Sequence, residues 1–532
     1  MNNKIGIFLF AILWGTQLLG QKLISYQAEI GTQSPTNENV WILNRSVIAK
    51  HEGMVLYADS ALFDRAENSF TAFRNIKIVI DDSIYIYGQQ LFYNGNTRIA
   101  TINEKVKLID GDMILTTNKL EYDRNTNIAH YLTRGVTTKN ENVLKSIKGY
   151  YHSDTKDFLF NDSVVLTDQS SVIYTDTMLY NTNTEIAFFE GPTHVYSDSS
   201  YVYSENGWYN SLTEESETNK NSYLQNKDQN VKADTIFYNR ITEFGIARRN
   251  VIMTDSTNNI ILTGEYAEMN NSKNFSFLTE MATAKFIDDN LDTLFLHADT
   301  LYAYTDTTQS FKSMSAYYKV KFYRDDVQGC CDSLYHTIAD SLTQMFYNPI
   351  IWMEERQFTG DTIDFVSGNE GLKTFRLMNN AFIISKEDSA EFDQVKGTSV
   401  FGYCKDGEID YVDVLGNSES VYYIREEEKD SLKPLIGTNV GKGENMRIHF
   451  ENREPVKIVT LVEPVMKIYP PQELPFELQY MPGFKWLYDK RPKSKYDIYL
   501  DCICKEELET PEVKQEEGGE PEKQDKAVVL PE

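Results

Sequence analysis

Short segments in which apolar and polar residues alternate recur along most of this 532-residue chain. Alternation with a period of two is typical of β-strands that have one buried face and one solvated face. One large apolar residue marks the first strand of each segment, and the successive intervals between these residues are 29, 29, 30, 28, 30, 28, 30 and 35. The residues are Leu62, Leu91, Leu120, Tyr150, Met178, Trp208, Ile236, Tyr266 and Leu301. The pattern predicts a repeat protein with units of about 29 residues.

A second alternating pair of apolar residues follows a glycine or asparagine turn in most units. The pairs are Ile76 and Ile78, Val106 and Leu108, Val164 and Leu166, Val251 and Met253, Ala284 and Phe286, and Val320 and Phe322. Lysines such as Lys77 and Lys107 stand between them, so one strand face is expected to look inward and the other at water. In the unit of Trp208 the second strand is replaced by the polar segment 213–230, which is expected to be an excursion loop.

Turn and proline chemistry set the fold class. Asn, Asp, Ser and Gly in segments such as NGNT and DRNTN tolerate left-handed backbone and form tight turns between strands. Pro192 is the only proline between residues 36 and 348, which leaves backbone donors available for long hydrogen-bond ladders. We therefore expect an all-β protein, an elongated repetitive open β-jellyroll or solenoid of two facing sheets.

The ends of the chain differ in composition from the repeats. Lys4 and an apolar run from Ile5 to Trp14 make residues 1–20 a predicted signal peptide, because a membrane-spanning helix needs about 20 apolar residues. The alternative is a short membrane anchor. We expect the mature protein to be exported to the periplasm, where it could associate with the outer membrane.

Four further regions follow the predicted signal peptide. Residues 21–330 hold the repeats, and residues 331–460 are predicted to be a further β-roll of the same kind. Residues 461–504 are rich in proline and aromatic residues and are expected to cap the final strands. Residues 505–532 contain ten acidic and four basic side chains and are predicted to be a disordered acidic tail.

Charge and motifs exclude several functions. With 52 Lys and Arg against 79 Asp and Glu, the formal net charge is −27, which repels nucleic acid and anionic membrane surfaces. The five cysteines lack the spacing of a zinc site, and no catalytic or nucleotide-binding motif is present. One or two disulfides, with Cys404 as a candidate member, stay open. We predict no enzyme activity, no metal and no cofactor.

The inward apolar face is the remaining candidate for function. An open roll would expose a long apolar trough, and such a surface requires a greasy ligand or a partner. Burying about ten methylenes at ~0.8 kcal/mol each would contribute about 8 kcal/mol. A negatively charged protein should hold an anionic lipid by its chains, with the head group outside.

Two quoted units carry a family resemblance. The phrases ADTIFYN…GIARRNVIMTD and NKLEYDRNTNIAHYLTRGVTT resemble the repeat of the OstA/LptA superfamily of lipopolysaccharide-transport proteins over roughly residues 30–330, and longer OstA-like proteins extend the likeness to about residue 490. The resemblance implies a twisted open β-jellyroll whose interior carries lipid A acyl chains. It also implies end-to-end β-strand augmentation with other Lpt jellyrolls or with a second copy. The chain is longer than the short bridge proteins and has no segment resembling a membrane barrel, so a bridge and an accessory role both stay open.

The leading prediction is a periplasmic lipopolysaccharide-binding carrier or bridge with no nucleic-acid partner. Its expected lipid-groove residues are Ile76, Ile78, Leu91, Val106, Leu108, Leu120, Ile236, Val251, Met253 and Leu301. The same residues would be ordinary packed core in a closed roll. The alternative function is a secreted β-solenoid adhesin or structural surface protein, which would bind through its outer face.

Overall fold

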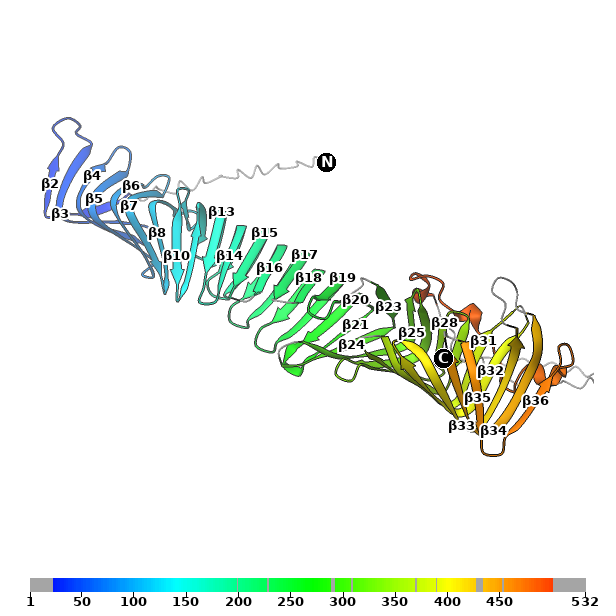
Figure 1. The fold of residues 1–532 in the computed structure, drawn as a ribbon. Helices are drawn as coiled ribbons and strands as arrows, with labels where there is room; N and C mark the ends of the chain where they lie inside the picture. The colour runs from blue at the N-terminus through cyan, green and yellow to red at the C-terminus, as the bar shows by residue number, and fades with distance from the viewer. Residues whose placement is uncertain are drawn as a thin grey trace, which may run out of the picture.

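The computed structural model describes residues 23–500 except 199, 227–228, 289–291, 308–309, 369–370, 389, 427–433 and 452–453. The predicted signal peptide and acidic tail lie outside the described residues, as do Cys502 and Cys504. The described chain is an elongated roll in which strands stack one after another along the long axis (Figure 1). All 36 strands belong to one continuous sheet, and every pairing is antiparallel. The prediction of an all-β, elongated repeat fold is confirmed.

The strands of the first half are β1 (Ser25–Gln27), β2 (Ile30–Gln33), β3 (Val40–His51), β4 (Met54–Asp64), β5 (Ser69–Ile80), β6 (Ile84–Asn94), β7 (Ile99–Asp110), β8 (Met113–Asp123), β9 (Ile128–Tyr131), β10 (Gly135–Lys139), β11 (Asn142–Ser146), β12 (Lys148–His152), β13 (Asp157–Thr167), β14 (Ser171–Asn181), β15 (Ile186–Ser197), β16 (Ser200–Asn210), β17 (Glu215–Asn226), β18 (Gln229–Asn239) and β19 (Phe244–Asp255).

The second half contains β20 (Ile260–Asn270), η1 (Asn271–Lys273), β21 (Phe275–Thr279), β22 (Thr283–Ile287), β23 (Thr293–His297), β24 (Thr300–Thr305), β25 (Phe311–Arg324), β26 (Val327–Thr337), β27 (Leu342–Phe346), β28 (Ile350–Met353), β29 (Arg356–Thr359), β30 (Thr362–Gly368), β31 (Gly371–Lys386), β32 (Phe392–Lys405), β33 (Glu408–Arg425), β34 (Leu435–Glu451), β35 (Glu454–Leu461), β36 (Val465–Tyr469), α1 (Phe476–Gln479), η2 (Tyr488–Lys490) and η3 (Asp497–Tyr499). No helix of the described chain is long and apolar enough to cross a membrane.

A bulge in the middle of every second strand bends the sheet into two facing arms. In β5 the residues Arg74 and Asn75 both have positive φ, and the register with β4 and β6 shifts at this point. The glycine or asparagine turn expected before each second apolar pair is therefore a bulge inside one strand. We call the arm that contains Ile76–Ile80 arm 1 and the arm that contains Ser69–Phe73 arm 2.

The same bulge recurs along the roll with two consecutive left-handed residues. These pairs are Arg45–Ser46, Arg74–Asn75, Glu104–Lys105, Asp162–Ser163, Lys220–Asn221, Arg249–Asn250, Tyr318–Lys319 and Asn379–Asn380. Where the second residue is asparagine, its amide donates to a carboxylate of the preceding strand. Asn221 donates to Glu205 over 2.7 Å, and Asn250 donates to Asp234 over 3.1 Å. These bonds hold the bent strands in register.

Some layers consist of two half-strands in place of one bent strand. Strands β9 and β10 both pair with β8, and they are separated at Arg134, which has positive φ. Strands β11 and β12 both pair with β13 and form the next layer. The roll therefore keeps its cross-section whether or not the strand is continuous at the corner.

The interior holds two large apolar clusters. The first extends from Ile24 to Phe189 and the second from Val231 to Ile448. Between them, inward positions carry small or hydroxyl side chains, including Ser204, Gly207 and Ser222. The apolar lining of the roll is therefore interrupted at β16 and β17.

The prediction of an excursion loop at residues 213–230 is wrong. Residues Glu215–Asn226 form β17, a full strand paired with both β16 and β18. Its inward hydroxyls donate to carbonyls of β18, as Thr218 does to Ile236 over 3.3 Å and Ser222 does to Asp234 over 3.3 Å. Since these polar groups are satisfied by the neighbouring strand, a polar segment can occupy a buried strand position.

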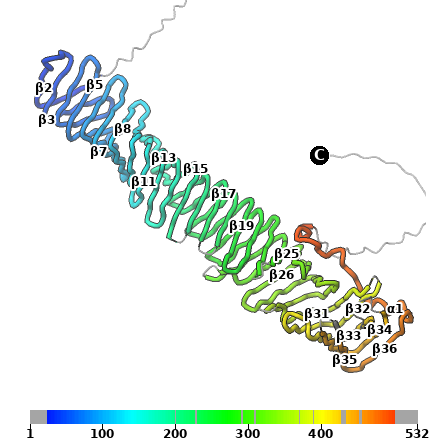
Figure 2. The backbone as a smooth tube through the Cα atoms, turned by 45° about the horizontal axis from the view of Figure 1, so that its top comes forward, coloured from blue at the N-terminus to red at the C-terminus, as the bar shows by residue number. Residues whose placement is uncertain are grey.

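The C-terminal segment takes an extended path over the roll. After β35 and β36 have joined the sheet, residues 470–500 run back along the outer face of arm 1 toward β23 (Figure 2). Three buried glutamines bind this segment, which we call the strap. Gln394 contacts the main chain at Gln479 and Met481, Gln357 contacts it at Lys485 and Leu487, and Gln328 accepts from the Arg491 guanidinium. Cys404 forms no disulfide among the described residues.

The corner asparagines provide a test of this architecture. Replacing Asn221 by Ala removes the bond to Glu205 and places a Cβ-bearing residue without a polar group at φ 55°. We expect a loss of about 1–2 kcal/mol in the free energy of unfolding, since both the hydrogen bond and left-handed tolerance are lost. Asn221→Gly keeps the left-handed conformation at no steric cost and should lose less. Urea unfolding of both variants checks this, and an equal loss in both would contradict the bulge argument.

Candidate functional site

All ten predicted groove residues point into the interior, but they fall into two groups. Ile76, Ile78, Leu91, Val106, Leu108 and Leu120 are fully buried in the first apolar cluster. Ile236, Val251 and Leu301 are buried in the second cluster, and Met253 packs against it while partly buried. The polar interruption at β16 and β17 separates the two groups.

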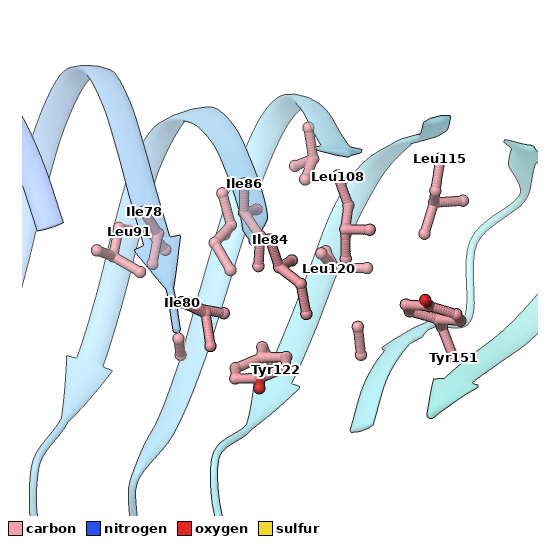
Figure 3. Close-up of a cluster of buried hydrophobic side chains, with 14 of the residues drawn as sticks. Ile78, Ile80, Ile84, Ile86, Leu91, Leu108, Leu115, Leu120, Tyr122 and Tyr151 are labelled. Carbon is pink, nitrogen blue, oxygen red and sulfur yellow. The ribbon is translucent and has the colours of Figure 1, made fainter. Parts of the chain in front are cut away.

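The first group is closely packed in this structure. Ile78, Leu91, Leu108 and Leu120 lie between successive bent strands with their side chains directed toward one another (Figure 3). Each is at most 1% exposed. In this conformation the interior from β5 to β8 is therefore a core, and a ligand would reach it only if the two arms separated.

Ion pairs join the turns at the free edges of the two arms, across the mouth of the roll. Arg98 contacts Glu52 at 3.0 Å, Arg124 contacts Asp81 at 2.8 Å and Lys156 contacts Asp110 at 2.6 Å. The fourth pair has the opposite sign, with Lys139 on arm 1 and Glu185 on arm 2 at 2.8 Å. We call this row of four pairs the seam.

The arm-1 members of the seam follow the repeat. Glu52, Asp81, Asp110 and Lys139 are each 29 residues apart, as their residue numbers show. The sequence analysis missed them because it treated acidic turn residues only as turn formers. Their spacing was a readable signal, whereas their partners on arm 2 became visible only in three dimensions.

The seam fails at the next repeat. Asp168 stands 29 residues after Lys139, but the turn of arm 2 that should face it carries Glu214 and no cation. Two carboxylates facing each other would repel, so no direct pair can form. Arg240 reaches in from the following turn of arm 2, 3.6 Å from Glu214 and 3.5 Å from the Ser170 hydroxyl.

A cavity of about 450 Å³ lies at this failure of the seam. Its apolar lining is formed by Leu144, Phe160, Leu166 and Ala187. Charged and polar side chains surround its mouth, namely Lys139, Asp168, Glu185 and Arg240. The cavity therefore combines an apolar floor that continues the first cluster with a polar rim of both charge signs.

Two tyrosines line the cavity between floor and rim. Burial raises the pKa of Tyr180, and the nearby carboxylates of Glu185 and Asp112 add to the rise. Burial also raises the pKa of Tyr209, with Glu214 and Asp168 contributing. Both phenols therefore stay neutral at physiological pH and present hydrogen-bond donors within the cavity.

A second interior cavity of about 320 Å³ lies farther along the roll. Phe286, Leu296, Phe322 and Leu334 contribute to its lining, and Arg324 stands among its polar residues. Burial lowers the pKa of His336 in this lining, so the imidazole is neutral at pH 7. The second apolar cluster, like the first, is thus accompanied by a space large enough for a ligand.

The protein is thus an elongated β-roll with an apolar core. Ion pairs close part of its mouth, and a cavity opens into the core where these pairs end. The family described as OstA-like protein matches residues 22–176 and 162–234. The resemblance to this family is confirmed over that part of the chain, which contains the seam and all of the first cavity's lining except Arg240.

One of the solved structures that match part of this chain is that of a bacterial protein. It is LptH, the LptA-homologous periplasmic component of the lipopolysaccharide transport device from Pseudomonas aeruginosa. The likeness has 10% sequence identity and a TM-score of 0.21, and it covers 27% of this chain and 95% of LptH. A TM-score this low supports no conclusion about the present chain. No curated protein sequence matches the chain significantly.

The Lys139–Glu185 pair predicts a pH-dependent contribution to stability. The hydrogen bond from Lys139 holds the pKa of Glu185 below its ordinary value of 4.5, although burial acts in the opposite direction. A carboxyl whose pKa is lowered by folding stabilises the protein above its unfolded pKa, and this contribution is lost as the pH falls through the folded value. Lys139→Met should therefore cost about 1–2 kcal/mol at pH 7, and the difference from wild type should shrink below pH 4.5.

Urea unfolding of Lys139→Met at neutral and acidic pH measures this effect. The matched control is Lys148→Met, because Lys148 pairs with Asp162 at a site where both side chains are 44% exposed, against 11% for Lys139 and 20% for Glu185. The control should change stability little at either pH. Equal losses in the two variants would show that the seam pair is an ordinary surface pair.

Proposed function

We propose that this protein is a periplasmic carrier or bridge in lipopolysaccharide transport, which holds acyl chains in the apolar interior of its roll. The carrying observation is the first cavity, where an apolar floor opens to solvent at the repeat where the row of seam pairs ends. The match to the OstA-like family over the same residues supports the proposal.

The size and lining of the cavity suit part of a lipid. Ligand sites commonly measure about 300–1,000 Å³, and this cavity measures about 450 Å³. Each methylene removed from water contributes about 0.8 kcal/mol, so even a partly inserted acyl chain would gain several kcal/mol of binding free energy. Leu144, Phe160 and Leu166 provide an apolar surface for that chain.

The charge of the protein fixes the orientation of such a lipid. The net charge of −27 opposes burial of an anionic head group inside the roll. Arg240 and Lys139 at the mouth are the local cations, and both already stand beside carboxylates. An anionic head group would therefore remain at the mouth or outside it, with only the chains inside.

The ten predicted groove residues belong to the same proposal at a later step. They lie in the closed core on either side of the polar interruption, so they would contact acyl chains only after the seam has opened. Each seam pair joins a different layer of the roll, so the pairs can open one after another from the cavity.

Partners of jellyroll type would dock at the ends of the roll. At one end the strand β36 pairs with β34, and Val465, Met466 and Ile468 are exposed on it. At the other end β2 pairs with β3, and all four of its residues are exposed. Exposed edges of this kind are templates for β-augmentation by another Lpt protein or a second copy of this chain.

The alternative of a secreted adhesin or structural surface protein needs no interior ligand. It would be favoured if the cavity stayed empty and the protein were released to the cell surface or medium. Cell fractionation distinguishes the two, because a transport carrier must remain in the periplasm.

Photocrosslinking from the cavity floor tests the proposed function directly. A photoreactive residue at Leu166 should give an adduct with lipopolysaccharide in cells, because this side chain lines the cavity. The same probe at Lys107, which lies on the outward face of β7, should give none. No adduct at Leu166 in cells that make normal lipopolysaccharide would contradict the proposal.

Reversing one charge should close the opening. Glu214→Lys gives Asp168 the cation that the repeat lacks there, so the seam should extend over the cavity mouth. We expect at least a fivefold loss of the Leu166 adduct, which corresponds to about 1 kcal/mol in favour of the closed mouth. The Arg240–Glu214 pair that is lost is largely exposed, so overall stability should change little. Glu190→Lys is the control, since it makes the same charge change at an exposed position of β15. Equal adduct yields in both variants would show that the mouth does not control access.

A further inference from the structure

An array of aromatic side chains covers the outer face of arm 1 over strands β14 to β17. It consists of two rows of residues that lie opposite one another across these strands. The row nearer the mouth contains Val172, Tyr196, Tyr201 and Gln225, and the next row contains Tyr174, His194, Tyr203 and Tyr223. We call these eight residues the tyrosine array.

The rings of the array contact one another and form a continuous surface. Tyr174 and Tyr196 have ring centroids 6.0 Å apart, Tyr196 and Tyr201 are 5.1 Å apart, and Tyr201 and Tyr223 are 6.2 Å apart. Tyr174 is 48% exposed and Tyr196 is 49% exposed. A hollow lined by Val172, Tyr174, Tyr196 and His194 lies between them.

Hydroxyl and amide groups border the rings, and Lys232 of β18 lies opposite Tyr223, just beyond the end of the second row. His194 Nδ1 lies 2.9 Å from the Tyr201 hydroxyl, and the Tyr223 hydroxyl donates to Gln225 over 3.4 Å. In a chain with a net charge of −27, an array that contains no carboxylate, lysine or arginine favours a neutral occupant. Flat aromatic faces edged by hydroxyls fit the C–H faces and hydroxyl groups of sugar rings.

The array is continuous with the mouth of the first cavity. The turn 168–170 lines that cavity, and Val172 of the array follows it in β14. A molecule whose chains enter the cavity would pass over this turn and reach the array on the outer face. One amphipathic ligand can therefore occupy both sites.

The same outer face shows what a protein-covered surface looks like in this chain. Under the strap it is built from buried side chains such as Cys330, Trp352, Phe382 and Ile384, and glutamines bind the strap main chain. In the tyrosine array Tyr174 and Tyr196 are half exposed, and the polar groups are mostly hydroxyls. These differences favour a saccharide over a polypeptide as its occupant.

We propose that the tyrosine array binds the neutral saccharide portion of the glycolipid whose acyl chains enter the first cavity. This inference rests on the proposed function for its ligand, and it assigns a separate binding surface to the sugar. The turn 168–170 would lie between the two parts of the bound molecule.

Binding of a delipidated saccharide tests the array without the cavity. The probe is the oligosaccharide released from lipopolysaccharide by mild acid, which carries no acyl chains. We expect saturation-transfer NMR and calorimetry to detect its binding to the full chain. The double variant Tyr196→Ala/Tyr201→Ala should lower the affinity by about tenfold or more, since stacking contacts on two rings are lost.

Controls separate this outcome from a loss of folding. Tyr57→Ala removes a comparably exposed tyrosine on the outer face of β4 and should leave the affinity unchanged. Tyr196→Phe/Tyr201→Phe keeps both rings and should retain most of the binding. Circular dichroism should show the same thermal midpoint for all variants, because the array lies outside the core.

The outcomes distinguish the array from the proposed function. If the wild-type protein does not bind the oligosaccharide while Leu166 still forms lipopolysaccharide adducts, the array proposal is overturned and the carrier function stands. The array proposal is also overturned if Tyr57→Ala lowers the affinity as much as the double variant does. A photoreactive residue at Tyr196 that captures only polypeptide would assign the array to a protein partner and overturn the saccharide.

Discussion

The bulge at the middle of every second strand is the constraint on which this structure depends. An antiparallel sheet of consecutive hairpins has no intrinsic reason to enclose an interior, since its two faces are equivalent until the strands bend. Two consecutive left-handed residues, as at Arg74–Asn75, bend each strand and turn one face of both halves inward. Ile78 of arm 1 and Phe70 of arm 2 thereby enter the same core.

Backbone cost explains why this bend is tied down by side chains. Left-handed backbone is unfavourable for arginine, lysine and glutamate, which occupy several of these positions. Asparagine tolerates it, and Asn221 and Asn250 also bond across to Glu205 and Asp234. The packed interior and these corner bonds offset the strain, so each repeat supports the bend of the next.

Most of the fold could be predicted from the alternation of apolar and polar residues. Period-two pairs such as Ile76 and Ile78 predicted strands, the 29-residue spacing predicted repeats, and both were confirmed. The polar segment 213–230 misled the same reasoning, because its buried hydroxyls donate to carbonyls of the adjacent strand and need no apolar partner. The strap was equally hidden, since no local pattern reveals that Gln357 and Gln394 bind a main chain that comes more than eighty residues later.

The groove residues illustrate a different limit. The sequence predicts that Leu91, Leu120 and Val251 point inward, and they do. Whether inward residues contact a ligand or one another depends on the distance between the arms, and four charged pairs in the turns join the arms at their edges. The closed mouth can be recognised only in the structure, where Glu52 contacts Arg98 and three further ion pairs follow along the seam.

Those pairs also set the tilt of the strands across the roll. The turn after β3 meets the turn after β6, and the turn after β5 meets the turn after β8. The next two pairs keep the same offset of three layers, when β9–β10 and β11–β12 each count as one layer. At about 4.8 Å per strand this offset shifts the two edges by roughly 14 Å along the axis.

At the cavity the offset is larger. Ser170 meets Arg240, two layers beyond the regular partner, because Glu214 occupies the regular place. A single acidic residue in a turn therefore interrupts both the seam and the regular tilt. The opening of the core follows from the local sequence of one repeat, whereas the turns of the four preceding arm-1 positions carry charges opposite to those they meet on arm 2.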